Sequence, residues 1–317
     1  MIAANPNLSP MHPVLLFTYK RLQTLKNTIS YLLLNPEVVD TDLFVFSDGP
    51  KSADEESTII EVREYLKTIT GFKSITLNFS DTNKGLANSI ISGVSNVLVQ
   101  TEAVIVLEDD LEVSNDFLFY MNTCLDKYKQ ATRVFSISGF SLPFQHNKNL
   151  NSDIYFLKRG WSWGWATWRD RWENIDWELK DYQLFASNKA FQKAFSLGGS
   201  DLNQMLEKQM SGKLDSWAIR WTYHQFKVSG LTAYPLYTKV VNKGFDQFAT
   251  HTSGSYNRYR TKNIDLSNSK RTLLLPDIIA TNPYYVRQFL NKMSFTARIK
   301  SKIESLLKKA AIFLIMN

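Results

Sequence analysis

The chain has 317 residues, of which 44% are hydrophobic and 21% are charged, and this composition excludes a largely disordered protein. The net charge of +7 and the pI of about 9.2 indicate an anionic partner, but nucleic acid, a lipid surface and a phosphorylated substrate all fit. The single cysteine, Cys124, excludes an intrachain disulfide and a cysteine-rich zinc site, and favours a reducing compartment.

Targeting signals are absent from the sequence pattern. The first 13 residues lack a basic region followed by a sustained apolar stretch, so they do not resemble a secretory signal. No later run is long and apolar enough to span a bilayer. These features predict a cytoplasmic protein.

Apolar runs and amphipathic stretches alternate along the first 110 residues. The predicted strands cover residues 14–19, 43–47, 75–79 and 103–107, and the predicted helices lie near residues 22–33, 54–66 and 86–98. This alternation predicts an α/β fold with right-handed crossovers and a mostly parallel sheet. In such sheets, ligands bind beyond the carboxyl ends of the strands.

The last of these strands runs directly into three acidic residues, Glu108, Asp109 and Asp110. Adjacent carboxylates repel one another, and a hard divalent ion with a phosphate-bearing ligand would relieve that repulsion. The alternative is a solvated acidic turn before a helix that begins near Asn115, where negative charge is favourable. The local pattern supports both interpretations equally.

Polar residues also follow the other three predicted strands. Lys20 and Arg21 follow the first, Asp48 the second, and Lys84 the third. Cations and carboxylates gathered at one sheet edge suit a nucleoside diphosphate with a metal ion, although each lysine alone reads as ordinary surface charge.

A tryptophan-rich stretch follows a further predicted strand at 134–138, a loop at 143–152 and a short strand at 155–157. It contains Trp161, Trp163, Trp165 and Trp168, and Trp172 and Trp177 lie just beyond. Structural packing explains most of these side chains. One or two of Trp161, Trp163 and Trp165 could instead form a platform for a sugar ring.

The later sequence predicts helices near 190–195, 202–210 and 217–228, a strand at 238–242, and a loop at 243–254 that could close over a ligand. Asp215 precedes the third of these helices. It is either the helix N-cap or a carboxylate general base, and one residue can serve as both.

The C-terminal stretch from 294 to 317 alternates apolar and basic residues at helical spacing. It predicts a basic amphipathic helix that lies on a membrane surface, and the alternative is a helix packed on protein. The predicted organisation is a domain over 1–253, a connecting segment over 254–293, and this tail.

Taken together, five segments resemble a GT-A fold glycosyltransferase, closest to bacterial sugar transferases related to the N-acetylglucosaminyltransferase I family. The resemblance covers roughly residues 13–253. Its segments are Pro13–Arg21, Ser47–Gly49, Asn83–Leu86, Val106–Val113 with Asp116 and Phe117, and Gly160–Trp165, and the Glu-Asp-Asp sequence is the most specific part. The resemblance implies a Rossmann-like, mostly parallel twisted sheet flanked by helices, with a helical C-terminal extension.

The resemblance also implies roles for individual residues on the donor side. Arg21 and Asp48 match positions that contact the uridine base, and Lys84 lies in a segment that approaches the nucleotide. Glu108 matches a donor-sugar contact, Asp109 a ribose or sugar contact, and Asp110 the ligand of a Mn²⁺ or Mg²⁺ ion.

Two further residues are implied near the acceptor and the diphosphate. Asp215 matches the catalytic base, although Ser216 replaces one aspartate of the family's Asp-Asp-Trp motif. His251 lies in a loop that folds over the bound donor. In that loop, a contact from His251 to a phosphate is a simpler interpretation than a bond from His251 to the metal ion.

These roles predict an inverting, metal-dependent transfer of a sugar, N-acetylglucosamine or a related hexose, from a UDP-sugar to a hydroxyl. The expected acceptor is a bacterial surface glycan or lipid-linked glycan at the inner membrane, with no nucleic-acid partner. The alternatives are a nucleotidyltransferase, although residues 19–23 contain no phosphate-binding glycine, and a noncatalytic glycan-binding protein.

Overall fold

The computed structural model describes residues 10–146, 151–244, 271–300 and 303. Within these residues an eight-stranded sheet has the strand order β3-β2-β1-β4-β8-β6-β9-β7. The strands are β1 (Val14–Thr18), β2 (Asp42–Ser47), β3 (Ser74–Phe79), β4 (Ala103–Glu108), β6 (Val134–Ser138), β7 (Ile154–Leu157), β8 (Trp165–Trp168) and β9 (Leu231–Pro235).

The sheet is mostly parallel, as the sequence predicts. Strands β3, β2, β1 and β4 pair in parallel, and β6 pairs in parallel with β9. Strand β8 is antiparallel to both β4 and β6, so those two strands run in the same direction, and β7 is antiparallel to β9. Six strands therefore point one way and two the other.

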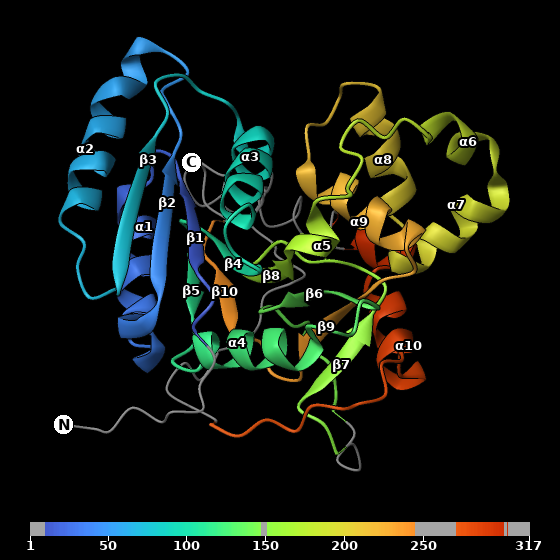
Figure 1. Cartoon of the computed structure of the whole chain (residues 1–317). Coiled ribbons are helices and arrows are strands. Elements are labelled where there is room, and N and C mark those ends of the chain that lie inside the picture. Colours follow the sequence, from blue (N-terminus) through green and yellow to red (C-terminus); the bar gives the residue numbers. More distant parts are fainter. Residues whose placement is uncertain (1–9, 147–150, 245–270, 301–302, 304–317) are drawn as a thin grey trace, which may run out of the picture.

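Helices cover both faces of the sheet (Figure 1). Helices α1 (Leu22–Leu32), α2 (Glu56–Lys67) and α4 (Phe117–Tyr128) contribute to one buried cluster, and α3 (Leu86–Leu98) and α9 (Trp217–Lys227) to another. Successive residues of β1 and β4 alternate between the two clusters, which is why these strands read as unbroken apolar runs. Short 3₁₀ turns are η1 (Pro36–Asp40), η2 (Ala53–Glu55) and η3 (Ser196–Gly198).

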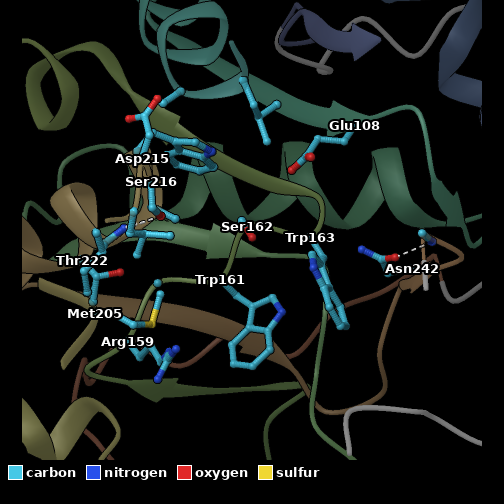
Figure 2. Close-up of a pocket in the computed structure, with 18 of the residues that line it drawn as sticks. Glu108, Arg159, Trp161, Ser162, Trp163, Met205, Asp215, Ser216, Thr222 and Asn242 are labelled. Atoms are coloured by element: carbon cyan, nitrogen blue, oxygen red, sulfur yellow. Dashed lines mark hydrogen bonds between the residues drawn. The ribbon is translucent and has the colours of Figure 1, made fainter. Parts of the chain in front are cut away.

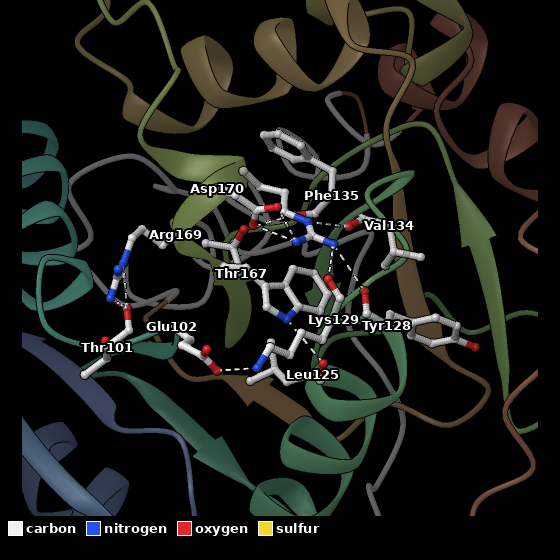
Figure 3. Close-up of polar contacts among 12 residues, drawn as sticks. Thr101, Glu102, Leu125, Tyr128, Lys129, Val134, Phe135, Thr167, Arg169 and Asp170 are labelled. Atoms are coloured by element: carbon white, nitrogen blue, oxygen red, sulfur yellow. Dashed lines mark hydrogen bonds and ion pairs between the residues drawn. The ribbon is translucent and has the colours of Figure 1, made fainter.

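The tryptophan-rich strand β8 is fixed by contacts to its neighbours (Figure 3). Thr167 Oγ1 donates to the carbonyl of Phe135 at 2.9 Å, and Trp168 Nε1 donates to the carbonyl of Leu125 at 3.2 Å. The guanidinium of Arg169 bonds the carbonyl of Thr101 at 2.8 and 3.1 Å. These bonds attach β8 and the start of α5 to β6, to α4 and to the segment between α3 and β4.

A second, two-stranded sheet lies beside the acidic residues. Strand β5 (Leu111–Val113) pairs antiparallel with β10 (Val240–Asn242), so that Leu111 faces Asn242. Lys243 N donates to the carbonyl of Asp110 at 2.8 Å. This pairing brings the chain at 242–244 against the end of β4.

Helices α5 (Arg169–Trp172), α6 (Tyr182–Ser187), α7 (Lys189–Phe195) and α8 (Leu202–Met210) follow β8. Of these, α6, α7 and α8 share a buried cluster with the far side of α9. Helices α6 to α9 are called the helical subdomain. It carries the polypeptide over the carboxyl edge of the sheet and returns it through α9 (Figure 1).

Part of the expected connecting segment is described, and it belongs to the packed core. Leu273, Leu275 and Ile279 pack on the main cluster, and α10 (Pro283–Lys292) buries Tyr285 and Phe289 against β7 and its neighbours.

The start of the basic tail is helical over 295–300, and Arg298 donates to the carbonyl of Ser200 and to Gln204 Oε1, both at 3.2 Å. The remaining tail, apart from Ile303, lies outside the described residues. Across the described ranges, none of the helices has the length and apolar character needed to span a bilayer.

Candidate active site

The sheet brings the end of β1 beside the acidic end of β4. Phe17 pairs with Glu108 in parallel register, and the residues that follow β1 then bond the carboxylates that follow β4. Asp109 Oδ2 accepts from Thr18 Oγ1 at 2.9 Å and from Tyr19 N at 3.1 Å. The strand-end rule thus places the acidic residues beside the first strand end, as the sequence predicts.

Arg21 is the cation of this cluster. Its Nη2 lies 3.1 Å from Asp109 Oδ1 and 2.6 Å from Asp110 Oδ2, and it is the residue immediately before α1. The predicted partners Arg21, Asp109 and Asp110 therefore meet at one sheet edge.

The carboxyl groups of the cluster are hard to ionise together. Burial, followed by the charges of Asp110 and Asp109, raises the pKa of Glu108 to about 8. Burial, followed by the charge of Asp110, raises the pKa of Asp109 to about 6. The Arg21 guanidinium opposes both shifts, so additional positive charge at this edge would favour the ionised carboxylates.

A cavity of about 460 Å³ opens from the acidic cluster toward the helical subdomain. Figure 2 shows Glu108 and Asp215 on separate walls of this cavity: Glu108 comes from the end of β4, and Asp215 from the loop between α8 and α9. Of the residues singled out in the sequence, those lining the cavity are Arg21, Glu108, Asp110, Trp161, Trp163 and Asp215. Asp48, Lys84, Asp109 and Trp165 do not line it.

Asp215 is held on the cavity wall by an arginine. Arg220 Nη2 donates to Asp215 Oδ1 at 3.1 Å, while Arg220 Nε donates to the carbonyl of Ser216 at 3.3 Å. The N-cap of α9 is Ser216, whose Oγ accepts from Ile219 N at 3.4 Å. The N-cap interpretation of Asp215 is therefore wrong, because its neighbour fills that position and leaves the carboxylate exposed.

Asp48 organises the loop that contains Lys84. Its Oδ1 accepts from Gly49 N at 3.0 Å and Lys84 N at 2.8 Å, and its Oδ2 accepts from Gly85 N at 3.0 Å. Gly85 has a φ of +77°, a conformation that favours glycine, and it precedes the first residue of α3. Asp48 thus fixes the loop, and the Lys84 side chain is exposed.

The three candidate platform tryptophans occupy different environments. Trp165 is only 1% exposed and stacks on Trp172 and Trp217, with ring centroids 5.6 and 4.9 Å apart. The prediction that Trp165 could form a sugar platform is wrong, because both faces of its ring lie in the core. Trp161 is mostly buried and stacks on Phe140, whereas Trp163 is partly exposed and meets Phe140 edge-on.

Sequence reasoning missed the cavity residues Arg159 and Lys208, and it placed Asn242 and Gly244 only at the end of a strand and in a loop that could close over a ligand. Arg159 is held by two bonds to Asp201, at 2.8 and 2.9 Å. Gly244 passes so close to the cluster that a Cβ there would lie 2.0 Å from Asp110 Oδ2. The sequence signals were the arginine before Gly160 and Gly244 near the start of the predicted loop.

The described residues contain no group of three or more His, Cys, Asp or Glu side chains arranged to hold a metal ion. Asp110 nevertheless faces the cavity with a guanidinium already bound to its carboxylate, so a cation fits at this edge. A divalent ion here would take Asp110 from the protein and its other ligands from phosphate and water. The predicted contact His251 lies outside the described residues.

Two solved structures show remote similarity to this chain. No family model matches the sequence, and neither does any curated protein. A solved mannosyltransferase, PcManGT from Pyrobaculum calidifontis in complex with GDP-Man and Mn²⁺, aligns with 15% identity and a TM-score of 0.36, over 55% of this chain and 49% of that one. S. aureus TarS aligns with 10% identity and a TM-score of 0.38, over 53% of this chain and 30% of that one. Similarity at this level does not assign an activity.

Proposed function

We propose that the chain is a metal-dependent, inverting glycosyltransferase of the GT-A type. The observation that supports this best is the single cavity that joins the acidic end of β4, with Glu108 and Asp110, to the exposed carboxylate of Asp215 on the opposite subdomain. Transfer of a sugar needs these two functions at two places, because charge develops on the leaving group while the acceptor loses a proton.

The donor end of the site is the acidic cluster. Asp110 would hold a divalent ion, which neutralises the charge that develops on the departing diphosphate. Glu108, on the cavity wall, would contact hydroxyls of the donor sugar, and Arg21 would provide positive charge toward the phosphates. Asp48 and Lys84 belong to the adjacent loop, and their nucleotide contacts stay predictions.

The acceptor end is the wall that carries Asp215. Its carboxylate would take the proton of the attacking hydroxyl while Arg220 holds it in place. Attack from this side, opposite the leaving diphosphate, inverts the anomeric carbon. The partly exposed Trp163 and the adjacent Trp161 are the proposed sugar-contacting aromatic residues, since indole faces accept the apolar faces of sugar rings.

We further propose a UDP-sugar as donor, with N-acetylglucosamine or a related hexose as the sugar. The proposed acceptor is a bacterial surface glycan or a lipid-linked glycan at the cytoplasmic face of the inner membrane. Exposed Phe295, Ile299 and Ile303, spaced four residues apart and interleaved with basic residues, support membrane contact by the tail.

Two competing functions predict different binding behaviour. A noncatalytic glycan-binding protein would not bind UDP in a metal-dependent manner. A nucleotidyltransferase would bind nucleotide and metal, but would form a nucleotide–sugar bond from a sugar phosphate instead of releasing UDP from a nucleotide sugar.

The decisive experiment is calorimetric titration of UDP with and without Mn²⁺, followed by a panel of nucleotide sugars assayed for metal-dependent diphosphate release. Wild type should bind UDP only with Mn²⁺, and Asp110→Ala should lose this binding while remaining folded by circular dichroism. Glu61→Ala, which removes an exposed carboxylate from α2, is the matched control. Metal-independent UDP binding, or UDP binding unchanged in Asp110→Ala, would contradict the proposal.

Membrane contact needs a separate test. Co-sedimentation with anionic liposomes should be lost when residues 294–317 are removed. Equal sedimentation of the full and shortened chains would refute the membrane role of the tail.

A further inference from the structure

Arg21 is bound to the carboxylate that would have to be accessible to a metal ion. Its Nη2 lies 2.6 Å from Asp110 Oδ2, the carboxylate proposed to hold a divalent ion. The Arg21 side chain is 23% exposed, whereas those of Asp109 and Asp110 are 6% and 10% exposed. The ion pair is thus largely withdrawn from water. Opposite charges interact more strongly in such a buried position than at an open surface.

The backbone at Gly244 crowds the same oxygen. A Cβ at Gly244 would lie 2.0 Å from Asp110 Oδ2 and 3.1 Å from Arg21 Nη1, so the chain at 244 passes close to both the carboxylate and the guanidinium. A cation that binds this oxygen therefore competes with Arg21 for the same small space.

The Arg21 main chain is anchored by bonds that do not involve its guanidinium. Its backbone carbonyl accepts from Leu25 N at 3.1 Å and from Thr24 Oγ1 at 3.0 Å, which anchors the main chain at the start of α1. The guanidinium lines the cavity from this fixed point. Rotation of the side chain alone would carry the positive charge from Asp110 into the cavity.

We propose that Arg21 is an exchangeable counter-cation that couples metal binding to nucleotide binding. Without metal, it neutralises Asp110 and Asp109. When a divalent ion binds Asp110, the guanidinium transfers to the diphosphate of the donor. Guanidinium suits both partners, because its planar array of donors matches carboxylate and phosphate alike.

The coupling has a definite direction. Metal alone must displace Arg21 from Asp110, so it binds weakly because that ion pair is lost. A nucleoside diphosphate supplies new anionic partners and removes that penalty. By reciprocity, each ligand then strengthens the other by the same factor. This inference rests on the proposed donor site. It adds that the metal ion binds more weakly alone than with the nucleoside diphosphate, which the site by itself does not require.

The test measures Mn²⁺ binding without any turnover. Free Mn²⁺ is followed by electron paramagnetic resonance in wild type, Arg21→Met and Arg21→Gln, with and without saturating UDP. In the absence of UDP, both variants should bind Mn²⁺ about tenfold more tightly than wild type, within the usual range of coupling between sites. In wild type, UDP should tighten Mn²⁺ binding, and in both variants this effect should shrink by a similar factor.

Lys20→Met provides the matched control. It removes one positive charge from the adjacent residue, whose Nζ pairs with Glu55 Oε1 at 2.6 Å and makes no contact with Asp110. Its Mn²⁺ affinity should stay within twofold of wild type. Two substituted side chains at position 21 keep the test valid if one of the variants fails to fold.

The possible outcomes separate the two proposals. If wild type binds no Mn²⁺ even with UDP, the proposed metal-dependent function fails, and this inference fails with it. If wild type binds Mn²⁺ with UDP but the Arg21 variants bind it no more tightly than wild type in UDP-free solution, only the counter-cation role is overturned.

Discussion

Arg220 and Asp215 form an ion pair in which the cation is buried and the carboxylate is exposed. The two side chains are 11% and 62% exposed, and Arg220 Nη2 lies 3.1 Å from Asp215 Oδ1. Arg220 also bonds the carbonyls of Ser216 and Trp177, at 3.3 and 3.4 Å. The arginine therefore ties the carboxylate of this cavity-lining residue to the packed subdomain.

The first prediction concerns this pair. Asp215→Asn should retain donor binding and lower turnover at least about a hundredfold, because the amide cannot accept the acceptor's proton. Arg220→Lys should retain more turnover than Arg220→Met, because it keeps the charge beside Asp215. Steady-state kinetics with UDP titrations separates turnover from donor affinity, and near-normal turnover by Asp215→Asn would remove Asp215 from the role of base.

The second prediction concerns Asp48. Asp48→Ala leaves the amides of Gly49, Lys84 and Gly85 without their acceptor, and should cost about 1–3 kcal/mol in the free energy of unfolding. Asp48→Asn retains one acceptor oxygen and should lose less. Urea denaturation gives the stability, and hydrogen exchange should accelerate at Lys84 and Gly85. Unchanged exchange at both amides would show that the carboxylate does not hold the loop.

The third prediction separates two tryptophans. Trp165→Ala should destabilise the fold by about 3–5 kcal/mol, because its ring is fully enclosed by the core. Trp163→Ala should cost less stability, since its ring is partly exposed at the cavity wall. Urea denaturation of both variants checks the order. A larger loss for Trp163→Ala would contradict these burial assignments.

The fourth prediction concerns the acid stability of the fold. Burial, with a smaller contribution from Lys227, lowers the pKa of His224 in α9 below its usual value of 6.5. The folded state thus binds fewer protons than the unfolded state, so His224 costs stability as the pH falls below 6.5. His224→Gln should reduce the loss of melting temperature between pH 7 and pH 5. An identical pH dependence in variant and wild type would show that His224 does not contribute.

The first half of the fold could be predicted because local patterns determine it. Strands such as β1 and β4 are apolar on both faces, and each is followed by polar residues that mark its end. The strand-end rule then placed Arg21 near Asp110 without any knowledge of their distance.

The rest of the fold depended on contacts between distant segments. Strand β8 was missed because two buried tryptophans are compatible with a strand, a helix or a loop. Only the sheet shows that Trp165 and Trp168 enter opposite core clusters. Gly244 reaches Asp110 through the pairing of β5 with β10, two short strands far apart in sequence. Ser216, not Asp215, caps α9. The sequence could not distinguish the two, because Ser and Asp have nearly equal preferences for the N-cap position.

The position of β8 also bears on how the protein is assembled. Strands β3, β2, β1 and β4 all lie within the first 108 residues, whereas β4 reaches β6 only through β8, which ends at residue 168. During synthesis, the first four strands and their helices can associate while the chain is still being extended. Strand β8 can join β4 to β6 once Trp165–Trp168 has been synthesised, but β7 is added to the sheet only through β9, at Leu231–Pro235. The cavity is completed later still, because its lining includes residues of α8 and α9 and, after β9, Asn242 and Gly244.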